Sequence, residues 1–297
     1  MKIIISGASG LVGSALVPDL ENRGLDVVRL IRPPRQPSQG EASWDPRKGE
    51  LAPSVLEGAD VVINLNGRSI GNGRWNEKVK NELRQSRLDS TNTLVAAIAA
   101  CERPPSLLVN ASAVGYYGDR GDELLVEASA PGSGFLADLS RDWEQAALAA
   151  EASGTRVVLL RLGMVVAAGG ALEKMLPPFK LGLGGPMGSG RQFWPWVALA
   201  DVLGVIRHVM EEPTISGPVN VVSPKEMRSS EFAATLGSVL RRPAFLPLPA
   251  FAARLVLGEM GDALLLASQR VRPSVLEEKG YTFETPELEA AIRNALA

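Results

Sequence analysis

Residues 2–17 of the chain read KIIISGASGLVGSALV. The apolar, β-branched run Lys2–Ser6 is typical of a buried strand, and the residues after Gly13 take up helical spacing. Gly7 and Gly10 lie in the turn between these two segments. A strand, a glycine turn and a helix in this order predict the first crossover of a nucleotide-binding α/β fold.

Each glycine of this turn has its own predicted role. Gly7 allows the tight turn, Gly10 lets the backbone approach a pyrophosphate, and Gly13 lets helix and strand pack closely. Free N–H groups at the helix start then face the phosphates, with the helix dipole behind them. The spacing is G-x-x-G-x-x-G rather than G-x-G-x-x-G, and a turn that only joins a strand to a helix is the alternative. We expect a dinucleotide to be held by Gly7, Ser9, Gly10, Leu11, Val12 and Gly13.

Bulk composition limits the class of protein. A chain of 297 residues can bury a large core, as one large α/β domain or as two unequal ones. A net charge of −2 gives no electrostatic reason to expect nucleic acid or an anionic membrane. One cysteine excludes an internal disulfide, and one cysteine with one histidine argues against a metal site. With neither a membrane span nor a signal peptide in view, a cytoplasmic protein is expected.

Strands alternate with helices through the first two thirds of the chain. This alternation predicts a Rossmann-type, doubly wound parallel sheet with the strand order 3-2-1-4-5-6. Ligands of such sheets bind beyond the carboxyl ends of the strands, where Arg32, Asn64 and Ser112 should converge. The predicted strands after the first are residues 27–31, 42–44, 59–65, 107–112, 157–160 and 219–222, and the long helices are 77–100 and 136–152.

The composition changes after Arg161, where glycine-rich and aromatic stretches begin. Helices are predicted at residues 202–210, with Asp201 as the N-cap, and at 229–240, 250–257, 263–269 and 286–296. We expect residues 1–218 to form the NAD(P)-binding domain, with substrate-loop insertions from about residue 164. Residues 245–297 should form a smaller, mostly helical substrate domain that folds back over the carboxyl edge of the sheet.

Arg32 predicts which dinucleotide is bound. NAD-binding versions of this fold carry an acid about 20 residues beyond the glycines, and it binds the ribose 2′-OH. Arg32 lies there instead, and a guanidinium suits the 2′-phosphate of NADP(H) bidentately. We therefore expect NADP(H) rather than NAD; the alternative is a solvated loop arginine.

Several motifs resemble those of the extended short-chain dehydrogenase/reductase superfamily. The closest resemblance is to its atypical branch called the epimerase family, some members of which are labelled cell-division-inhibitor-like. The resemblance covers nearly the whole chain and implies a Rossmann-type domain, an NADP(H) site and an unassigned substrate. The motifs are Gly7–Gly13, Asn64–Gly67, Arg74-Trp75, Ser86-Arg87, Ala111–Gly118, Asp142–Glu144, Pro178–Gly185, Gly188–Gln192, Gly258-Glu259 and Gln269–Val271.

By position, the resemblance implies that Asn64, Leu65 and Gly67 line the adenosine side of the cofactor. Asn66 departs from the alanine that is usual in the family, which affects local packing.

Three further residues are candidates for cofactor contact. Arg87 stands where many extended members have an asparagine near the cofactor, so Ser86 and Arg87 are implied to lie there; an exposed helix face is the alternative. Arg161, at the end of a strand, either reaches toward the nicotinamide or is a buried arginine paired with an acid.

The catalytic pair of the superfamily is missing. Its members use Tyr-x-x-x-Lys, in which the tyrosine passes a proton to the carbonyl oxygen and the lysine lowers the pKa of the tyrosine and holds the ribose. Aligning Glu144 with the glutamate after that motif puts Leu136 at the tyrosine and Ser140 at the lysine. Neither side chain can perform those tasks.

The remaining candidates for catalysis follow the fifth strand. Ser112 is suited to hydrogen-bonding a carbonyl, and Tyr116 or Tyr117 to donating a proton. A structural role is the alternative for all three, since serine and tyrosine are common in such turns.

Gln192, Trp194 and Trp196 are the predicted substrate wall, because they lie among glycines that permit close approach. Core packing under the C-terminal region is the alternative. His208 falls within a predicted helix and is treated as structural.

Together these features predict an NADP(H)-binding oxidoreductase or epimerase-like enzyme that acts on a small carbonyl or alcohol compound. The alternative is a non-catalytic NADP(H)-binding sensor or regulatory protein, which the missing tyrosine and lysine favour. No metal and no nucleic acid or membrane partner is expected. Substrate identity and oligomeric state are not predicted.

Overall fold

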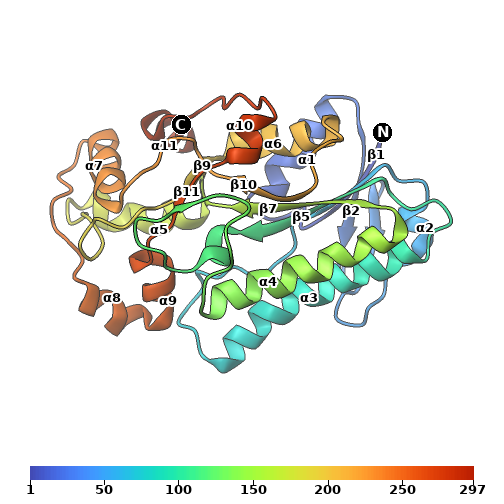
Figure 1. Cartoon of the computed structure of the whole chain (residues 1–297), viewed down its shortest axis with the longest axis horizontal. Coiled ribbons are helices and arrows are strands. Elements are labelled where there is room, and N and C mark those ends of the chain that lie inside the picture. Colours follow the sequence, from blue (N-terminus) through green and yellow to red (C-terminus); the bar gives the residue numbers. More distant parts are fainter.

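A seven-stranded parallel sheet forms the centre of the computed structural model, which describes residues 1–297 (Figure 1). Its strand order is β10-β7-β5-β4-β1-β2-β3, and every neighbouring pair is parallel. Two short two-stranded parallel sheets, β8-β9 and β6-β11, lie outside it. The strands are β1 (Lys2–Ser6), β2 (Asp26–Ile31), β3 (Glu41–Ser43), β4 (Val61–Asn64), β5 (Leu107–Ala113), β6 (Leu124–Leu125), β7 (Arg156–Leu162), β8 (Met164–Val166), β9 (Trp196–Ala198), β10 (Gly217–Val221) and β11 (Arg270–Val271).

This sheet confirms the doubly wound fold. The predicted order 3-2-1-4-5-6 corresponds to β3-β2-β1-β4-β5-β7, and β10 adds a seventh strand beside β7. Because all seven strands run the same way, the segments that follow β1, β2, β4, β5 and β7 leave the sheet at one edge. The order also reverses between β1 and β4, where a ligand crevice is expected.

Helices account for most of the remaining chain. The π-helical turn η3 ends at Leu266, so the helix predicted for residues 263–269 is shorter than expected. The helices are α1 (Gly13–Asn22), α2 (Pro53–Leu56), α3 (Glu77–Ala99), α4 (Phe135–Leu148), α5 (Gly170–Lys180), α6 (Leu199–Glu211), α7 (Ser229–Leu240), α8 (Ala250–Leu257), α9 (Glu259–Gly261), α10 (Ser274–Glu278) and α11 (Leu288–Leu296), with the 3₁₀ helices η1 (Val114–Tyr117) and η2 (Ala149–Ser153) and the turn η3 (Asp262–Leu266). None of them combines the length and apolar character that a membrane span requires.

Alternate strand residues supply the two sides of the core. In β1, Ile3 and Ile5 pack toward α1 and α6, whereas Ile4 packs toward α3. Figure 1 shows α1, α6 and α10 above the sheet and α3 and α4 below it. This two-sided burial explains why the strands are apolar runs rather than alternating sequences.

Asp201 has a different place from the one predicted. It lies in the first turn of α6, whose N-cap is Ala198. The buried Asp201 carboxylate accepts hydrogen bonds from the backbone N–H groups of Glu284 (2.6 Å) and Thr285 (3.1 Å). It therefore fastens the C-terminal segment to α6 instead of capping the helix.

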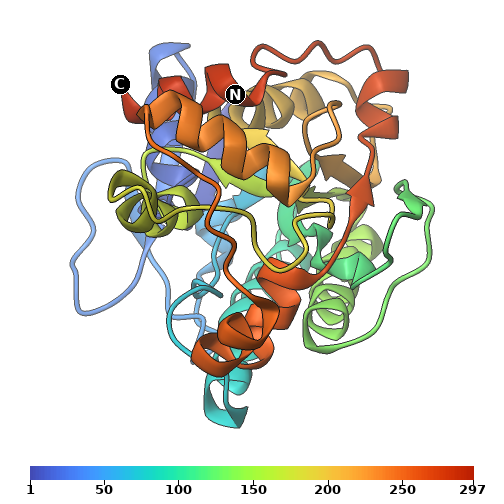
Figure 2. The same ribbon diagram turned by 90° about the vertical axis from the view of Figure 1, so that its left-hand side faces the viewer.

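The C-terminal region lies against the end of the sheet where the candidate residues gather. In Figure 2 the orange helix α7 stands in front of the sheet, and the orange-red helix α8 lies lower. β11 pairs with β6, just after the loop that follows β5. A separate apolar cluster joins α5, α7 and α11 to β8 and β9 around Trp196 and Phe232. The small helical region thus packs beside the carboxyl ends of the strands.

Candidate functional site

The glycine turn has the close contacts that its sequence predicts. Gly7 adopts φ +78°, and a Cβ there would lie 2.7 Å from the carbonyl carbon of Leu65. A Cβ at Gly13 would lie 2.3 Å from the carbonyl oxygen of Gly7. Real Cβ atoms do not approach so closely, so both positions require glycine.

Gly10 has room on its outer side, and the N–H groups next to it are free. Its Cβ would meet only the carbonyl oxygen of Gly7, at 3.3 Å. The backbone N–H groups of Ser9, Leu11 and Val12 donate no hydrogen bond within the protein. Unsatisfied donors at the start of α1 are suited to phosphate oxygens.

A cavity of about 550 Å³ opens beside this turn, and its lining has more arginines than acids, of which Asp45 is the one present. Gly7, Ala8 and Ser9 form one side of it. Four arginines contribute to the rest of the lining: Arg29, Arg32, Arg35 and Arg47. Arg32 follows β2 directly, is exposed, and makes no ion pair within the protein. Its guanidinium is therefore available to an anion in the cavity.

Glu41 is the acid that organises two of these arginines. Its buried carboxylate lies 2.6 Å from Arg35 and 3.5 Å from Arg29. Hydrogen bonds from the Ser38 hydroxyl and N–H lower the pKa of Glu41. Glu41 thus orients Arg29 and Arg35, while Arg32 and Arg47 remain unpaired.

Asn64 is completely buried, so its side chain does not line the cofactor groove as predicted. It accepts a hydrogen bond from the Ser6 hydroxyl (2.6 Å) and donates to Asn110 Oδ1 (2.6 Å) and Thr91 Oγ1 (3.0 Å). These bonds tie the ends of β1, β4 and β5 to α3. Asn64 therefore acts on the groove only by placing the loop at Leu65–Gly67, which touches the glycine turn.

Ser86 and Arg87 support the next part of that loop. The Ser86 hydroxyl accepts a hydrogen bond from the Arg68 N–H at 3.0 Å. The Arg87 guanidinium would lie 3.4 Å from a Cβ at Gly67 and stacks over Trp143, 5.0 Å from its ring centroid. Arg87 thus lies beside the cofactor loop, and it makes no ion pair.

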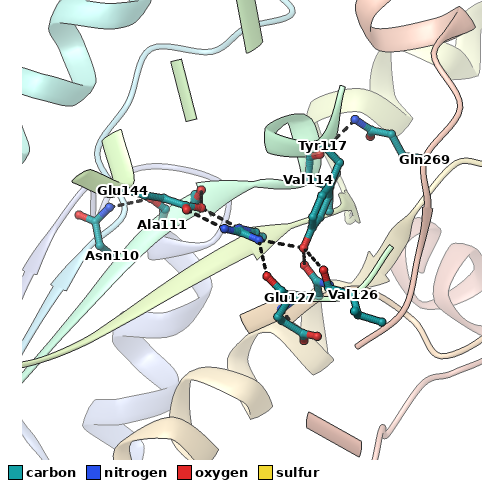
Figure 3. Close-up of polar contacts among 11 residues, drawn as sticks. Asn110, Ala111, Val114, Tyr117, Val126, Glu127, Glu144 and Gln269 are labelled. Atoms are coloured by element: carbon teal, nitrogen blue, oxygen red, sulfur yellow. Dashed lines mark hydrogen bonds and ion pairs between the residues drawn. The ribbon is translucent and has the colours of Figure 1, made fainter. Parts of the chain in front are cut away.

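A buried ion pair lies at the ends of β5 and β7 (Figure 3). Both oxygens of Glu144 accept hydrogen bonds from Arg161 at 2.8 Å, and Ser112 donates to Glu144 Oε1 at 2.6 Å. Burial lowers the pKa of Arg161, but its bonds to Glu144 and the nearby Tyr117 outweigh burial and leave that pKa above its usual value. Of the two alternatives for Arg161, the buried arginine paired with an acid is the one observed.

Tyr117 belongs to the same interior network. Its hydroxyl donates to Asn220 Oδ1 (2.7 Å) and accepts from Arg161 (3.0 Å), and burial raises the pKa of Tyr117 to about 12. With no exposed surface, Tyr117 cannot contact a substrate. Ser112 is also buried with its hydroxyl committed to Glu144, so the catalytic predictions for Ser112 and Tyr117 are not supported by this geometry.

Tyr116 is the remaining candidate for catalysis. It is partly exposed, and its ring is covered by the Arg161 guanidinium, 3.5 Å from the ring centroid. Its hydroxyl makes no hydrogen bond within the protein. Gln269 from the C-terminal region donates to the Val114 carbonyl at 3.0 Å and so holds the start of this loop (Figure 3).

The residues aligned with the missing pair stand next to the same loop. A Cβ at Gly115 would lie 3.2 Å from Leu136 Cβ and 3.8 Å from Ser140 Oγ. Leu136 and Ser140 of α4 therefore face the loop after β5, as the alignment requires, but neither side chain is an acid or a cation.

Gln192, Trp194 and Trp196 form part of the core rather than a substrate wall. Gln192 Nε2 donates to the Met187 and Leu265 carbonyls, and Trp194 Nε1 also donates to the Leu265 carbonyl. Trp196 is 1% exposed. Their burial under the C-terminal region favours core packing, the alternative, over a substrate wall.

Sequence reasoning missed several residues of the site. Arg35 and Arg47 line the same cavity as Arg32, but neither was predicted to do so. Glu144 was used only as a reference position for aligning Tyr-x-x-x-Lys, and its ion pair with Arg161 was not predicted. The partners of Glu144 lie 17 and 32 residues away, so local sequence carries no sign of them.

The site fits the phosphate groups of a dinucleotide. Free N–H groups lie at the glycine turn, and unpaired guanidinium groups lie in the adjoining cavity. No cluster of three His, Cys, Asp or Glu side chains is arranged to hold a metal ion.

Comparison with known proteins establishes the family. Residues 3–222 match the NAD dependent epimerase/dehydratase family, and residues 248–295 match a domain of unknown function, DUF1731. The chain belongs to the NAD dependent epimerase/dehydratase family, which confirms the resemblance found in the sequence.

Individual relatives extend over the whole chain. The epimerase family protein Mb2239 of Mycobacterium bovis is 42% identical over 95% of this chain and 93% of its own. The crystal structure of the human epimerase family protein SDR39U1 (isoform 2) with NADPH has a TM-score of 0.90 and 36% identity over 99% of each chain. UDP-glucose 4-epimerase of Thermus thermophilus in complex with NAD has a TM-score of 0.75 and 18% identity over 100% of this chain and 98% of its own, a likeness of fold alone.

Proposed function

We propose that this member of the epimerase family binds NADP(H) and uses it in an oxidoreductase or epimerase-like reaction on a small carbonyl or alcohol compound. Membership in an NAD(P)-binding family supports a dinucleotide site. The preference for NADP(H) over NAD(H) and the reaction itself are our inference.

The observation that carries the proposal is the basic cavity beside the glycine turn. NADP(H) differs from NAD(H) by the 2′-phosphate, so selectivity requires a cation near that position. Arg32 and Arg47 lie in the cavity without an acidic partner, and Glu41 holds Arg35 beside them. The similar human protein SDR39U1 was crystallised with NADPH, which supports the same choice of cofactor.

Different residues of the chain bind the cofactor and transfer the proton. The glycine turn binds the diphosphate through its free N–H groups, and the arginines bind the 2′-phosphate. When bound, the cofactor supplies the hydride that is exchanged with a substrate carbon. Tyr116 gives its hydroxyl proton to the substrate oxygen in reduction, and takes one back in oxidation. The Glu144–Arg161 pair fixes the position of the Tyr116 ring through the stacked guanidinium.

A second candidate function is that of an NADP(H)-binding sensor or regulatory protein. Leu136 and Ser140 at the positions of the superfamily pair favour it, as does the burial of Ser112 and Tyr117. Both candidates require the same cofactor site.

Two measurements test the proposal. Calorimetric titration should give a lower Kd for NADPH than for NADH. A panel of aldehydes, ketones and quinones should then include compounds that cause enzyme-dependent oxidation of NADPH, followed by its absorbance. Equal Kd values would refute the cofactor assignment, and tight NADPH binding without turnover on any compound would favour the sensor.

A further inference from the structure

Arg87 is a cation without an acidic partner in a partly buried position. Its Nη1 donates to the carbonyl oxygens of Leu83 (3.0 Å) and Arg68 (3.2 Å). Its Nε and Nη2 donate to no group of the protein. Burial lowers the pKa of Arg87 to about 10, so the guanidinium is still charged at neutral pH.

Two neighbouring arginines, in contrast, each have an acidic partner. Arg84, three residues earlier on α3, pairs with Asp142 of α4, and Arg68 pairs with Glu82. Burying a charged group costs free energy unless an anion or another hydrogen-bond acceptor binds to it. The free donors of Arg87 therefore require an explanation that the protein alone does not supply.

The surroundings of Arg87 connect the cofactor groove with α4. On one side its Nη2 would lie 3.5 Å from a Cβ at Gly67, in the loop that touches the glycine turn. On the other side its guanidinium stacks on Trp143. Trp143 follows Ser140 by one helical turn, and residues so spaced share a helix face.

Ser140 faces the loop after β5, on the side of the groove away from the 2′-phosphate cavity. Its Oγ would lie 3.8 Å from a Cβ at Gly115. The superfamily has a cation at this position of α4, and this chain has a serine. Arg87 reaches the same face of α4 from α3, and it brings the charge that Ser140 lacks.

We propose that Arg87 binds the oxygen atoms of the nicotinamide half of the cofactor, the ribose hydroxyls and the adjoining phosphate, in the place of the missing lysine. This inference rests on the proposed function, because it assumes that NADP(H) occupies the groove. It makes Arg87 a binding residue for the half of the cofactor that the cavity arginines do not touch.

The test separates the two halves of the cofactor. Adenosine 2′,5′-bisphosphate carries the 2′-phosphate and the adenosine but has no nicotinamide half. In Arg87→Met the charge is removed and the chain length is kept, so the Kd for NADPH should rise by about tenfold to a hundredfold. The Kd for adenosine 2′,5′-bisphosphate should stay within about a factor of two, because the proposal assigns Arg87 to oxygen atoms that this ligand lacks.

Matched variants complete the design. Arg84→Met on the same helix should leave both Kd values unchanged, and Arg32→Ala should raise both. Arg87→Lys keeps a charge and should recover part of the NADPH affinity; it also serves if Arg87→Met does not fold. Thermal unfolding of each variant confirms that the protein measured is folded.

The outcomes are distinct from those that test the proposed function. If Arg87→Met and Arg87→Lys weaken both ligands equally, or leave NADPH binding unchanged, the assignment of Arg87 is wrong although NADPH is still bound. If the unmutated protein binds neither ligand, the proposed function fails first, and the inference about Arg87 fails with it.

Discussion

Replacing Arg32 by alanine removes the one cavity arginine that directly follows β2 and has no acidic partner. Arg29 and Arg35 remain held by Glu41, so their positions should not depend on Arg32. The change therefore deletes one guanidinium from the cavity and leaves the glycine turn intact. We expect it to lower the affinity for NADPH and to leave the affinity for NADH nearly unchanged.

The magnitude follows from the charged hydrogen bond that the substitution removes. A hydrogen bond to a charged group contributes about 1.5–3 kcal/mol, and about 1.4 kcal/mol corresponds to a factor of ten in Kd. Arg32 is exposed, so salt screens its interaction, and Arg47 still offers a charge to the 2′-phosphate. The Kd for NADPH should thus rise by about tenfold to a hundredfold at low salt, and by less at high salt.

Isothermal titration of NADPH and NADH into both proteins measures the effect. Arg23→Ala is the matched control, because Arg23 is an exposed arginine just after α1 that pairs only with Asp19. It should change neither Kd. Similar Kd values for NADPH and NADH in the unmutated protein would refute the reasoning, and so would an equal loss of both ligands in Arg32→Ala.

The other predictions concern the turn, the two tyrosines and a buried acid. Gly10→Val places a branched side chain where the diphosphate must approach, so calorimetry should detect no NADPH binding while circular dichroism is unchanged; binding that survives would place the phosphates elsewhere. With a carbonyl compound found in the panel, Tyr116→Phe should lower turnover by about 10²–10⁴-fold with an unchanged Kd for NADPH, and full activity would exclude Tyr116 as the donor. Tyr117→Phe should instead lower the free energy of unfolding by about 1–3 kcal/mol in urea titrations, since Arg161 and Asn220 lose their buried partner; an unaltered stability contradicts this. Burial raises the pKa of Glu127 above its ordinary value of 4.5, so the folded state binds this proton more tightly and stability is lost as the pH rises through the raised pKa. Glu127→Gln carries no such charge, so the Tm of the variant minus the Tm of the unmutated protein should increase from acid to neutral pH. A Tm difference that does not change with pH would show that the pKa of the carboxyl is unperturbed.

Local patterns were sufficient for the architecture. Apolar runs such as Lys2–Ser6 form strands because both faces of a parallel sheet are buried. A short segment of this composition has few alternative structures. The right-handed crossover rule then favours the order 3-2-1-4-5-6, which is the observed order of β3, β2, β1, β4, β5 and β7. Gly7 and Gly13 were identified because the positive φ of Gly7 and the contact between Gly13 and the Gly7 carbonyl both belong to the local turn. The contact of Gly7 with Leu65 comes from a distant segment and was not predicted.

The position of Arg32 could be predicted for a similar reason. Arg32 directly follows β2, and the end of that strand has a fixed place relative to the glycine turn once the fold is given. The cavity observed there contains Arg32 together with three other arginines. Arg35 and Arg47 were not predicted, because a loop of prolines and polar residues has no periodicity that orients its side chains.

Side-chain direction at the carboxyl edge was decided only by the tertiary structure. Asn64, Ser112 and Arg161 do lie at the ends of adjacent strands, but neighbouring residues of a strand point to opposite sides. Their polar groups turn inward because each finds a buried partner on another element: Asn110 for Asn64, and Glu144 for Ser112 and Arg161. A polar residue near a site is the same in sequence whether it faces a ligand or a buried partner.

The C-terminal region also decides the direction of side chains that are far from it in the sequence. Gln192 and Trp194 resembled a substrate wall because glycines and aromatic side chains stand together there. Both instead donate hydrogen bonds to the carbonyl of Leu265, more than 70 residues later. The sequence by itself determined the strands of the central sheet, the order of six of them and the glycine turn, since these depend on local periodicity and backbone freedom. Which side chains remain open to a ligand depended on contacts between distant segments, and only the folded chain brings those together.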